Sequence, residues 1–194
     1  MEITQNMRQK AIDYKKNIAG RFILVEGASI KSRIVGEDFC VTRKVDGHLT
    51  VLFYESGNAV MLNSAGKEPA NAPACLEVFA QAMKAAGLKS AVLAAELYMP
   101  REGGRPRCGD VISARADETL RNRLALAAFD IIEIDGAAFK SSHYKDVHAR
   151  LKELCGTQSP LLHCVDMRTA SSPDEVKQIY EEWVEGEHAE GLVV

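Results

Sequence analysis

The chain has 194 residues, of which 46% are hydrophobic and 26% charged, and this composition excludes a wholly disordered chain. The length suits one sizeable domain with at most an appendage. The net charge of −3 argues against a dedicated nucleic-acid coat protein, although it leaves room for a local basic groove. The longest apolar stretch, Leu124 to Ile132, is interrupted by Asp130 and is too short to span a membrane.

The cysteines predict neither a disulfide framework nor a zinc knuckle, because they are odd in number, widely spaced and without a C-x-x-C pair. They are Cys40, Cys75, Cys108, Cys155 and Cys164. Reduced cysteines, together with first residues that lack an apolar signal segment, predict a cytoplasmic protein with no membrane partner.

Hydrophobic periodicity and turn residues predict one helix and four strands in the first third of the chain. In chain order they are a helix over Gln5 to Ala19 and strands over Phe22 to Glu26, Phe39 to Arg43, Leu49 to Tyr54 and Ala59 to Asn63. The last three strands predict a meander, since the turn Lys44-Val45-Asp46-Gly47 contains an Asp-Gly pair typical of a hairpin.

The rest of the chain mixes helices with apolar strands. The predicted elements are a helix over Ala74 to Ala86, buried strands over Ala91 to Tyr98 and Leu124 to Ile134, helices over Tyr144 to Leu154 and Pro173 to Glu185, and a strand in the closing EGLVV. A polar loop, Pro100 to Asp110, separates the two buried strands. His143 and His148 are five apart, so they do not share one helical face, and we expect both at the surface. Grouped strands with few regular βαβ units indicate an α+β fold.

Four short motifs carry chemistry only in combination. Lys44-Val45-Asp46-Gly47 alone is most simply a solvated turn. Further along, Glu96 lies in the apolar strand VLAAELYM, where a carboxylate is costly unless it is paired, hydrogen-bonded or bound to a cation. Phe129 and Asp130 then occur in AAFDIIEIDG, and Glu190 opens EGLVV.

In this order and at these separations, the motifs resemble the nucleotidyltransferase domain of the covalent-lysine superfamily, which contains ATP-dependent DNA ligases, RNA ligases and mRNA capping enzymes. The closest resemblance is to the adenylation domain of an ATP-dependent DNA ligase. It implies one domain over residues 1–194, with two antiparallel sheets flanked by helices in an ATP-grasp-like α+β fold. It also implies ATP and Mg²⁺ as cofactors, nicked DNA or RNA as the partner, and a role in DNA repair.

The resemblance assigns roles to the motif residues. Lys44 would be the catalytic nucleophile that attacks the α-phosphate of ATP and leaves a lysyl-AMP for later transfer to a 5′-phosphate at a nick. Glu96 would contact the ribose or the metal, Phe129 would stack on the adenine, and Glu190 would bind the metal. The implied nucleotide-binding set is Thr42, Arg43, Lys44, Asp46, Gly47, Glu96 and Phe129.

This chemistry suits the residue types. A lysine amine is nucleophilic only when unprotonated, and the reference pKa near 10.4 keeps an ordinary lysine charged at neutral pH. Burial or a nearby cation lowers such a pKa and frees the lone pair. Mg²⁺ takes oxygen ligands and keeps several waters, which fits the two carboxylates Glu96 and Glu190.

Two departures from the family pattern leave alternatives open. Leu49 stands where many DNA ligases have an arginine, which is more reminiscent of some RNA ligases, and Ser64 replaces an arginine in Asn63-Ser64-Ala65-Gly66. The alternatives are an RNA ligase, or a degenerate and non-catalytic module for nucleotide binding or protein interaction. The chain stops before a Lys-x-Lys motif and without an OB-fold domain, so we expect a natural polypeptide that continues past Val194.

Overall fold

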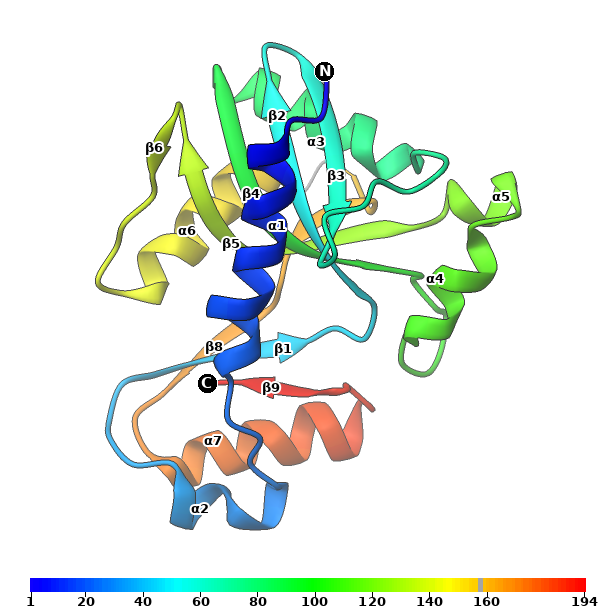
Figure 1. Cartoon of the computed structure of the whole chain (residues 1–194). Helices are drawn as coiled ribbons and strands as arrows, with labels where there is room; N and C mark the ends of the chain where they lie inside the picture. Colours follow the sequence, from blue (N-terminus) through cyan, green and yellow to red (C-terminus); the bar gives the residue numbers. More distant parts are fainter. Residues whose placement is uncertain (157–158) are drawn as a thin grey trace.

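A six-stranded sheet forms the centre of the fold (Figure 1). Its strands are β2 (His48–Glu55), β3 (Asn58–Asn63), β4 (Ser90–Tyr98), β5 (Ala125–Ile134), β6 (Ala137–Ala138) and β7 (Leu162–Cys164). They lie in the order β3-β2-β4-β5-β6, all antiparallel, while β7 pairs with β5 in parallel. The structure is a computed structural model and describes residues 1–156 and 159–194.

A second sheet of three strands lies below the large one in the view of Figure 1. It consists of β8 (Met167–Ala170), β1 (Phe39–Lys44) and β9 (Gly191–Val193), in that order and antiparallel. The middle strand comes from the first quarter of the chain, and both of its neighbours come from the last 30 residues. Distant segments therefore meet in this sheet.

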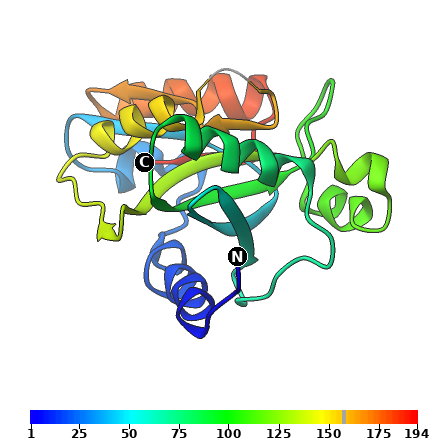
Figure 2. The same cartoon turned by 90° about the horizontal axis from the view of Figure 1, so that it is seen from above.

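The helices cover both sheets. They are α1 (Gln5–Asn17), α2 (Ile30–Arg33), α3 (Ala74–Ala85), α4 (Cys108–Ala114), α5 (Glu118–Arg121), α6 (Tyr144–Cys155) and α7 (Pro173–Tyr180), with short turns η1 (Ala19–Arg21), η2 (Gly27–Ser29) and the π-helical η3 (Glu181–Gly186). Figure 2 shows α1 on one side of the large sheet and α3 on the other. Within the part of the chain described here, no helix combines the length and hydropathy that a membrane crossing requires.

Alternation along the strands separates two cores on the large sheet. On one face, Leu52 and Leu93 pack with Phe79 of α3 and Leu151 of α6. On the opposite face, residues of β2, β3 and β4 pack against the apolar side of α1. A third cluster joins the small sheet to α7 and η3, around the buried Trp183.

Three contacts hold α1 on its face of the sheet. Lys10 pairs with Glu133 of β5 at 2.6 Å, and the Arg8 guanidinium donates to the carbonyl oxygen of Gly66 at 2.7 Å. The hydroxyl of Tyr14 donates to Asp130 of β5 at 2.8 Å. The first helix is therefore joined to β5 by two side chains and to the turn after β3 by a third.

The predicted fold class of two antiparallel sheets flanked by helices is confirmed, but three local predictions are wrong. The segment Phe22 to Glu26 is irregular rather than a strand, because no strand among residues 1–156 and 159–194 pairs with it, and Leu24 is 90% exposed. The turn after Lys44 does not close a hairpin, since β1 and β2 belong to different sheets. His148 is buried in α6, where its Nε2 donates to the carbonyl oxygen of Val165 at 2.8 Å.

Candidate active site

Lys44 is the last residue of β1, at the point where the chain leaves the small sheet. It lies opposite Gly191 in β9, so its neighbour Glu190 comes within reach of the amine. The Lys44 Nζ to Glu190 Oε2 distance is 2.5 Å, and the two side chains are 48% and 28% exposed. An ion pair across the end of two strands therefore holds the amine in place while leaving it accessible to solvent.

Gly47 carries the chain across to the large sheet at very close range. A Cβ atom at this position would lie 2.3 Å from the carbonyl oxygen of Leu97 and 3.0 Å from Cγ of Glu96. A backbone oxygen inside a sheet has little room to move, so only glycine fits here. This close approach brings the Lys44 turn against the strand that carries Glu96.

Asp46 is held by the loop that follows β4, residues 99–107, and by the first residue of α4. The backbone N–H of Cys108 donates to Asp46 Oδ1 at 3.1 Å, and the Arg105 guanidinium lies 4.0 Å from Asp46 Oδ2. The turn with the amine is therefore fixed on one side by β4 and on the other by this loop.

Glu96 is the most perturbed carboxylic acid of the site. Burial raises its pKa to about 7, and the neighbouring charge of Lys44 opposes that rise. The carboxylates of Glu190 and Asp46 raise the pKa of Glu96 further. The predicted residues Lys44, Glu96 and Glu190 thus share one electrostatic environment, and Glu96 changes its charge near neutral pH.

Phe129 lies on the face of the large sheet that α1 covers. It is the extra residue of a β-bulge, because Ala94 pairs with Asp130 and Ala95 with Ala128. Its ring packs beside Tyr14 with a centroid distance of 6.5 Å. Alternation along β4 places Glu96 on this same face, but Phe129 does not line the cavity beside Lys44 described below.

Thr42 and Arg43 take part in local contacts of β1. Thr42 is buried, and its hydroxyl donates to the carbonyl oxygen of Val193 at 3.3 Å. The Arg43 guanidinium stacks over Trp183 at 4.9 Å and donates to Glu187 at 2.5 Å. Both side chains therefore strengthen the small sheet and its contact with η3.

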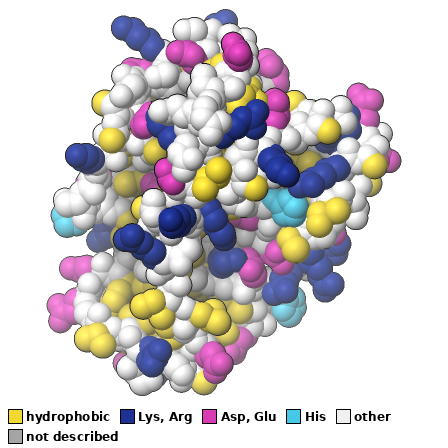
Figure 3. All heavy atoms as spheres, in the orientation of Figure 1, with side chains coloured by type: hydrophobic (Ala, Val, Ile, Leu, Met, Phe, Trp, Pro, Cys, Tyr) yellow, Lys and Arg dark blue, Asp and Glu magenta, His cyan; other side chains and the backbone are white. Residues whose placement is uncertain are grey.

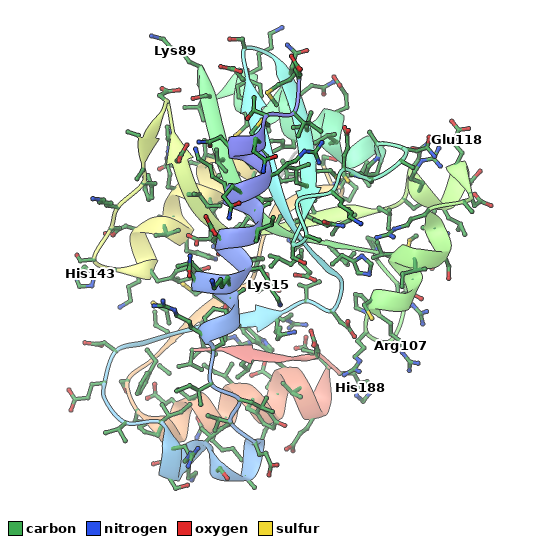
Figure 4. All side chains as sticks on the ribbon, viewed as in Figure 1. Lys15, Lys89, Arg107, Glu118, His143 and His188 are labelled. Atoms are coloured by element: carbon green, nitrogen blue, oxygen red, sulfur yellow. The ribbon has the colours of Figure 1, made fainter. Side chains whose placement is uncertain are left out.

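A cavity of about 210 Å³ opens beside Lys44. Residues around it include Lys44, Asp46, Tyr98, Arg105, His163 and Glu190. His163 Nδ1 lies 3.0 Å from the carbonyl oxygen of Cys164 and so donates, which leaves Nε2 to accept from the hydroxyl of Tyr98 at 2.8 Å. Figure 4 shows Lys15 of α1 on one side of this region and His188, which also borders the cavity, on the other.

Sequence reasoning did not place Tyr98, Arg105, His163 or His188 at this cavity. Tyr98 lies two residues after the predicted site residue Glu96, and this proximity in sequence could have indicated a place near the site. Arg105 lies in a polar loop, and His163 lies in a strand of three residues too short for any periodicity. The position of His163 at the cavity becomes evident only in the structure, through its hydrogen bond with Tyr98.

The carboxylates fit a magnesium ion only with help from other ligands. Within residues 1–156 and 159–194, no three His, Cys, Asp or Glu side chains are arranged to hold a metal by themselves. Glu96 and Glu190 supply two carboxylates beside the amine, and Mg²⁺ usually completes its shell with waters and substrate phosphates. The donor set is therefore chemically suitable for Mg²⁺ when phosphate is present.

One of three comparisons with known proteins identifies a family. The family model described as ATP dependent DNA ligase domain matches residues 24–194, so α1 lies outside the matched segment. The search of curated proteins gave no match. Solved structures, in contrast, gave many matches with this fold.

Three of these structures illustrate the likeness. The ligase domain of LigD from M. tuberculosis has a TM-score of 0.59 at 18% identity, over 80% of this chain and 47% of that one. The structure named Pmar-Lig_Pre has a TM-score of 0.67 at 16% identity, over 88% of this chain and 40% of that one. The ATP-dependent DNA ligase from bacteriophage T7, in complex with ATP, has a TM-score of 0.51 at 11% identity, over 99% of this chain and 60% of that one.

Identities this low show a common fold, and this chain spans 40% to 60% of the length of those three structures. The family match is broader, since it includes all residues of the two sheets and of the Lys44 turn. Neither comparison supports a non-catalytic interaction module. The chain therefore belongs to the ATP-dependent DNA ligase domain family, as a nucleotidyltransferase (adenylation) domain.

Proposed function

We propose that Lys44 is the residue that becomes adenylated. Its Nζ attacks the α-phosphorus of ATP, a P–N bond forms, the bond from that phosphorus to the bridging oxygen of the β-phosphate breaks, and pyrophosphate leaves. The observation that carries the proposal is the position of Nζ, 2.5 Å from Glu190 and close enough to the half-buried Glu96 to oppose the rise of its pKa.

The amine must lose a proton before or during this attack. Glu190 Oε2 is the group hydrogen-bonded to Nζ, so we assign it as the immediate proton acceptor. Glu96 and Glu190 are the residues that would hold Mg²⁺. A bound Mg²⁺ would supply charge stabilisation to the phosphate oxygens.

The nucleotide would lie along the face of the large sheet that carries Glu96 and Phe129. Glu96 would meet the ribose or the metal, and the Phe129 ring would stack on the adenine, with Tyr14 packing beside it. Thr42, Arg43, Asp46 and Gly47 would act through the shape of β1 and its turn. Nick sealing, a role in DNA repair and a cytoplasmic location are proposed for the full-length protein on family grounds, with DNA favoured over RNA as substrate.

The test uses the full-length protein with α-labelled ATP and Mg²⁺. We expect the protein to gain label, and expect Lys44→Arg and Lys44→Ala to lose it, because an arginine keeps the positive charge but is never an unprotonated nucleophile. Lys10→Ala is the matched control, since Lys10 also pairs with a glutamate, at 2.6 Å, and should keep the label.

Two outcomes would contradict this proposal. One is label that persists in Lys44→Arg, and the other is a wild-type protein that gains none. The non-catalytic alternative predicts binding of ATP without label, which calorimetry would detect. Sealing assays on nicked DNA and nicked RNA separate the two ligase classes.

A further inference from the structure

Two arginines from neighbouring strands of the small sheet stack on the indole ring of Trp183. The guanidinium carbon of Arg43 in β1 and that of Arg168 in β8 each lie 4.9 Å from the centre of the ring. A cation at this distance is attracted to the face of an aromatic ring. Trp183 is buried and belongs to the π-helical η3, a kind of turn that is frequent at functional sites. We call these three side chains the arginine–tryptophan stack.

Arg43 connects the end of β1 with segments from the last 30 residues of the chain. Its backbone N–H donates to the carbonyl oxygen of Asp166 at 3.0 Å, and its Nε lies 3.6 Å from the carboxylate of that residue. The guanidinium also donates to Glu187, which directly follows η3, at 2.5 Å. Its Nε is buried and finds no hydrogen-bond acceptor within residues 1–156 and 159–194, which costs free energy. A guanidinium held at such a cost calls for an explanation other than stability.

Arg168 stacks on the same ring but lies outside the candidate site. It forms two hydrogen bonds with the carboxylate of Glu182, both of 2.6 Å, and its side chain is 42% exposed. Arg43 borders the cavity beside Lys44, whereas Arg168 does not. The two arginines therefore share one aromatic partner, and only Arg43 links that partner to the candidate site.

The four-residue connection from η3 to β9, residues 187–190, is held by two successive residues of β1. Arg43 pairs with Glu187 and Lys44 pairs with Glu190, each at 2.5 Å. Successive side chains of a strand point to opposite faces, so these ion pairs attach the connection from both faces of β1. The place of Glu190, and with it the direction of the Lys44 amine, therefore depends on the contact between Arg43 and Glu187.

The strand end that carries Lys44 lies at the junction of the two sheets. Within the described part of the chain, the buried cluster around Trp183 is separate from the two clusters of the large sheet. Figure 3 shows charged side chains gathered along the level where the upper part of the molecule, with the large sheet, meets the lower part, with the small sheet. Charged contacts such as those of Arg43 therefore contribute to the geometry at this junction.

We propose that the arginine–tryptophan stack positions the Lys44 amine for its attack on ATP, with Arg43 and Trp183 as positioning residues. The ring fixes the Arg43 guanidinium, which fixes the end of β1 and, through Glu187, the connection that carries Glu190. A displacement of about 1 Å at a reacting group can cost on the order of 100-fold in rate, so a support of this kind has a large effect without touching the substrate. The inference rests on the proposed function, because the step it serves is the attack of Lys44 on ATP.

The test makes the same substitution at both arginines of the stack in the full-length protein. Arg43→Lys and Arg168→Lys each keep the positive charge but remove the planar group. The initial rate of labelling by α-labelled ATP is measured over a range of ATP concentrations. In Arg43→Lys we expect the maximal rate to fall at least about tenfold while the KM for ATP stays within about twofold of the wild type, because the amine is displaced without loss of a nucleotide contact. Arg168→Lys is the matched control, and both quantities should stay within about twofold of the wild type.

Thermal unfolding shows whether stability alone explains the difference. Both substitutions weaken one cation–π contact, so both should lower Tm by a similar amount, about 2 to 4 °C. Trp183→Phe keeps an aromatic face for both arginines and should label at a rate between those of the wild type and Arg43→Lys. A wild-type rate in Arg43→Lys, an equal loss in Arg168→Lys, or a loss confined to KM would overturn the proposal.

The reactivity of the Lys44 amine without ATP separates this inference from the proposed function. Lysines are acetylated with trace acetic anhydride, and mass spectrometry compares Lys44 with Lys10, which keeps its own glutamate partner. Arg43→Lys should make Lys44 more reactive relative to Lys10, because its carboxylate partner is displaced, while Arg168→Lys should leave this ratio unchanged. If no protein gains label from ATP but this difference remains, the proposed function fails and the positioning role stands. If the wild type gains label and Arg43→Lys changes neither labelling nor reactivity, the positioning role fails alone.

Discussion

The two sheets divide the candidate site between them, and they are built in different ways. The large sheet contributes Glu96 and Phe129 from strands that follow one another along the chain. The small sheet contributes Lys44, the last residue of β1, and Glu190, which directly precedes β9 and lies 146 positions further along the chain. Closing such a long loop costs entropy, which the contacts of the small sheet must offset.

Their electrostatics differ as well. The Lys44–Glu190 pair is accessible, whereas burial raises the pKa of Glu96 to about 7. A solvent-accessible amine thus lies in the same electrostatic environment as a half-buried carboxylate. The accessible amine and the half-buried carboxylate therefore come from different sheets, and the substitutions below test this division.

The largest effect is expected where the two sheets join. In Gly47→Ala, the added Cβ would meet the Leu97 carbonyl oxygen at 2.3 Å, so we expect a loss of about 3 kcal/mol in the free energy of unfolding, together with loss of labelling by ATP. Urea denaturation measures the first effect. Gly109→Ala is the control, because nothing lies within 4 Å of its Cβ and alanine favours helix, so that variant should be up to about 1 kcal/mol more stable. Equal stability of the two variants would contradict the close approach of Gly47 to the backbone of Leu97.

The next effect concerns Glu96, the half-buried carboxylate of the large sheet. The folded pKa of Glu96, about 7, lies above the ordinary value of 4.5, so the unfolded chain releases this proton first. Stability therefore falls as pH rises from about 4.5 to 7 and is constant above that range. Glu96→Gln removes this loss, and we expect it to be roughly 2 kcal/mol more stable than the wild type at pH 8.

Urea denaturation of both proteins at pH 4.5 and pH 8 measures this difference. At pH 4.5 the gap should be small, since the wild-type carboxyl is then protonated in the folded state. Glu77→Gln, at an exposed position of α3, is the control and should show no gap at either pH. A gap for Glu96→Gln that does not depend on pH would show that burial is not its cause. Labelling of the wild type should also weaken below pH 7, because a protonated Glu96 cannot hold a cation.

The smallest effect on stability is expected in the small sheet. Glu190→Gln breaks an exposed ion pair, which is worth at most about 1 kcal/mol, yet it removes the proton acceptor that contacts Lys44. We therefore expect nearly unchanged thermal unfolding with labelling reduced at least about tenfold. Glu182→Gln breaks a comparable exposed pair with Arg168 and should label normally. Parallel changes in stability and labelling would contradict the division between the sheets.

Local patterns predicted the large sheet well and the small sheet poorly. The hairpin of β2 and β3 and the buried strands β4 and β5 follow from apolar alternation and turn residues, which act between near neighbours. Asp46-Gly47 was misread as a hairpin because a turn signal reports a change of direction and not the sheet that the next strand joins. The partners of β1 lie more than 120 residues away, and no local pattern encodes that pairing.

The same difference applies to the site. The order of motifs predicted that Lys44, Glu96 and Glu190 belong together, and the structure brings them into one environment. The order of motifs could not predict that Arg105 and His163 border the cavity. Arg105 lies in a polar loop and His163 in a three-residue strand, and only their contacts with Asp46 and Tyr98 place them there. Whether such residues lie at the site depends on long-range packing rather than on residue type.

The central claim is that one amine, on Lys44, becomes covalently bonded to the nucleotide. Peptide mapping by mass spectrometry, after the full-length protein has been incubated with ATP and Mg²⁺, tests it most directly. We predict AMP attached to the side chain of Lys44 and to no other residue. AMP on a different lysine, or an unmodified Lys44 in protein that has released pyrophosphate from ATP, would contradict this account.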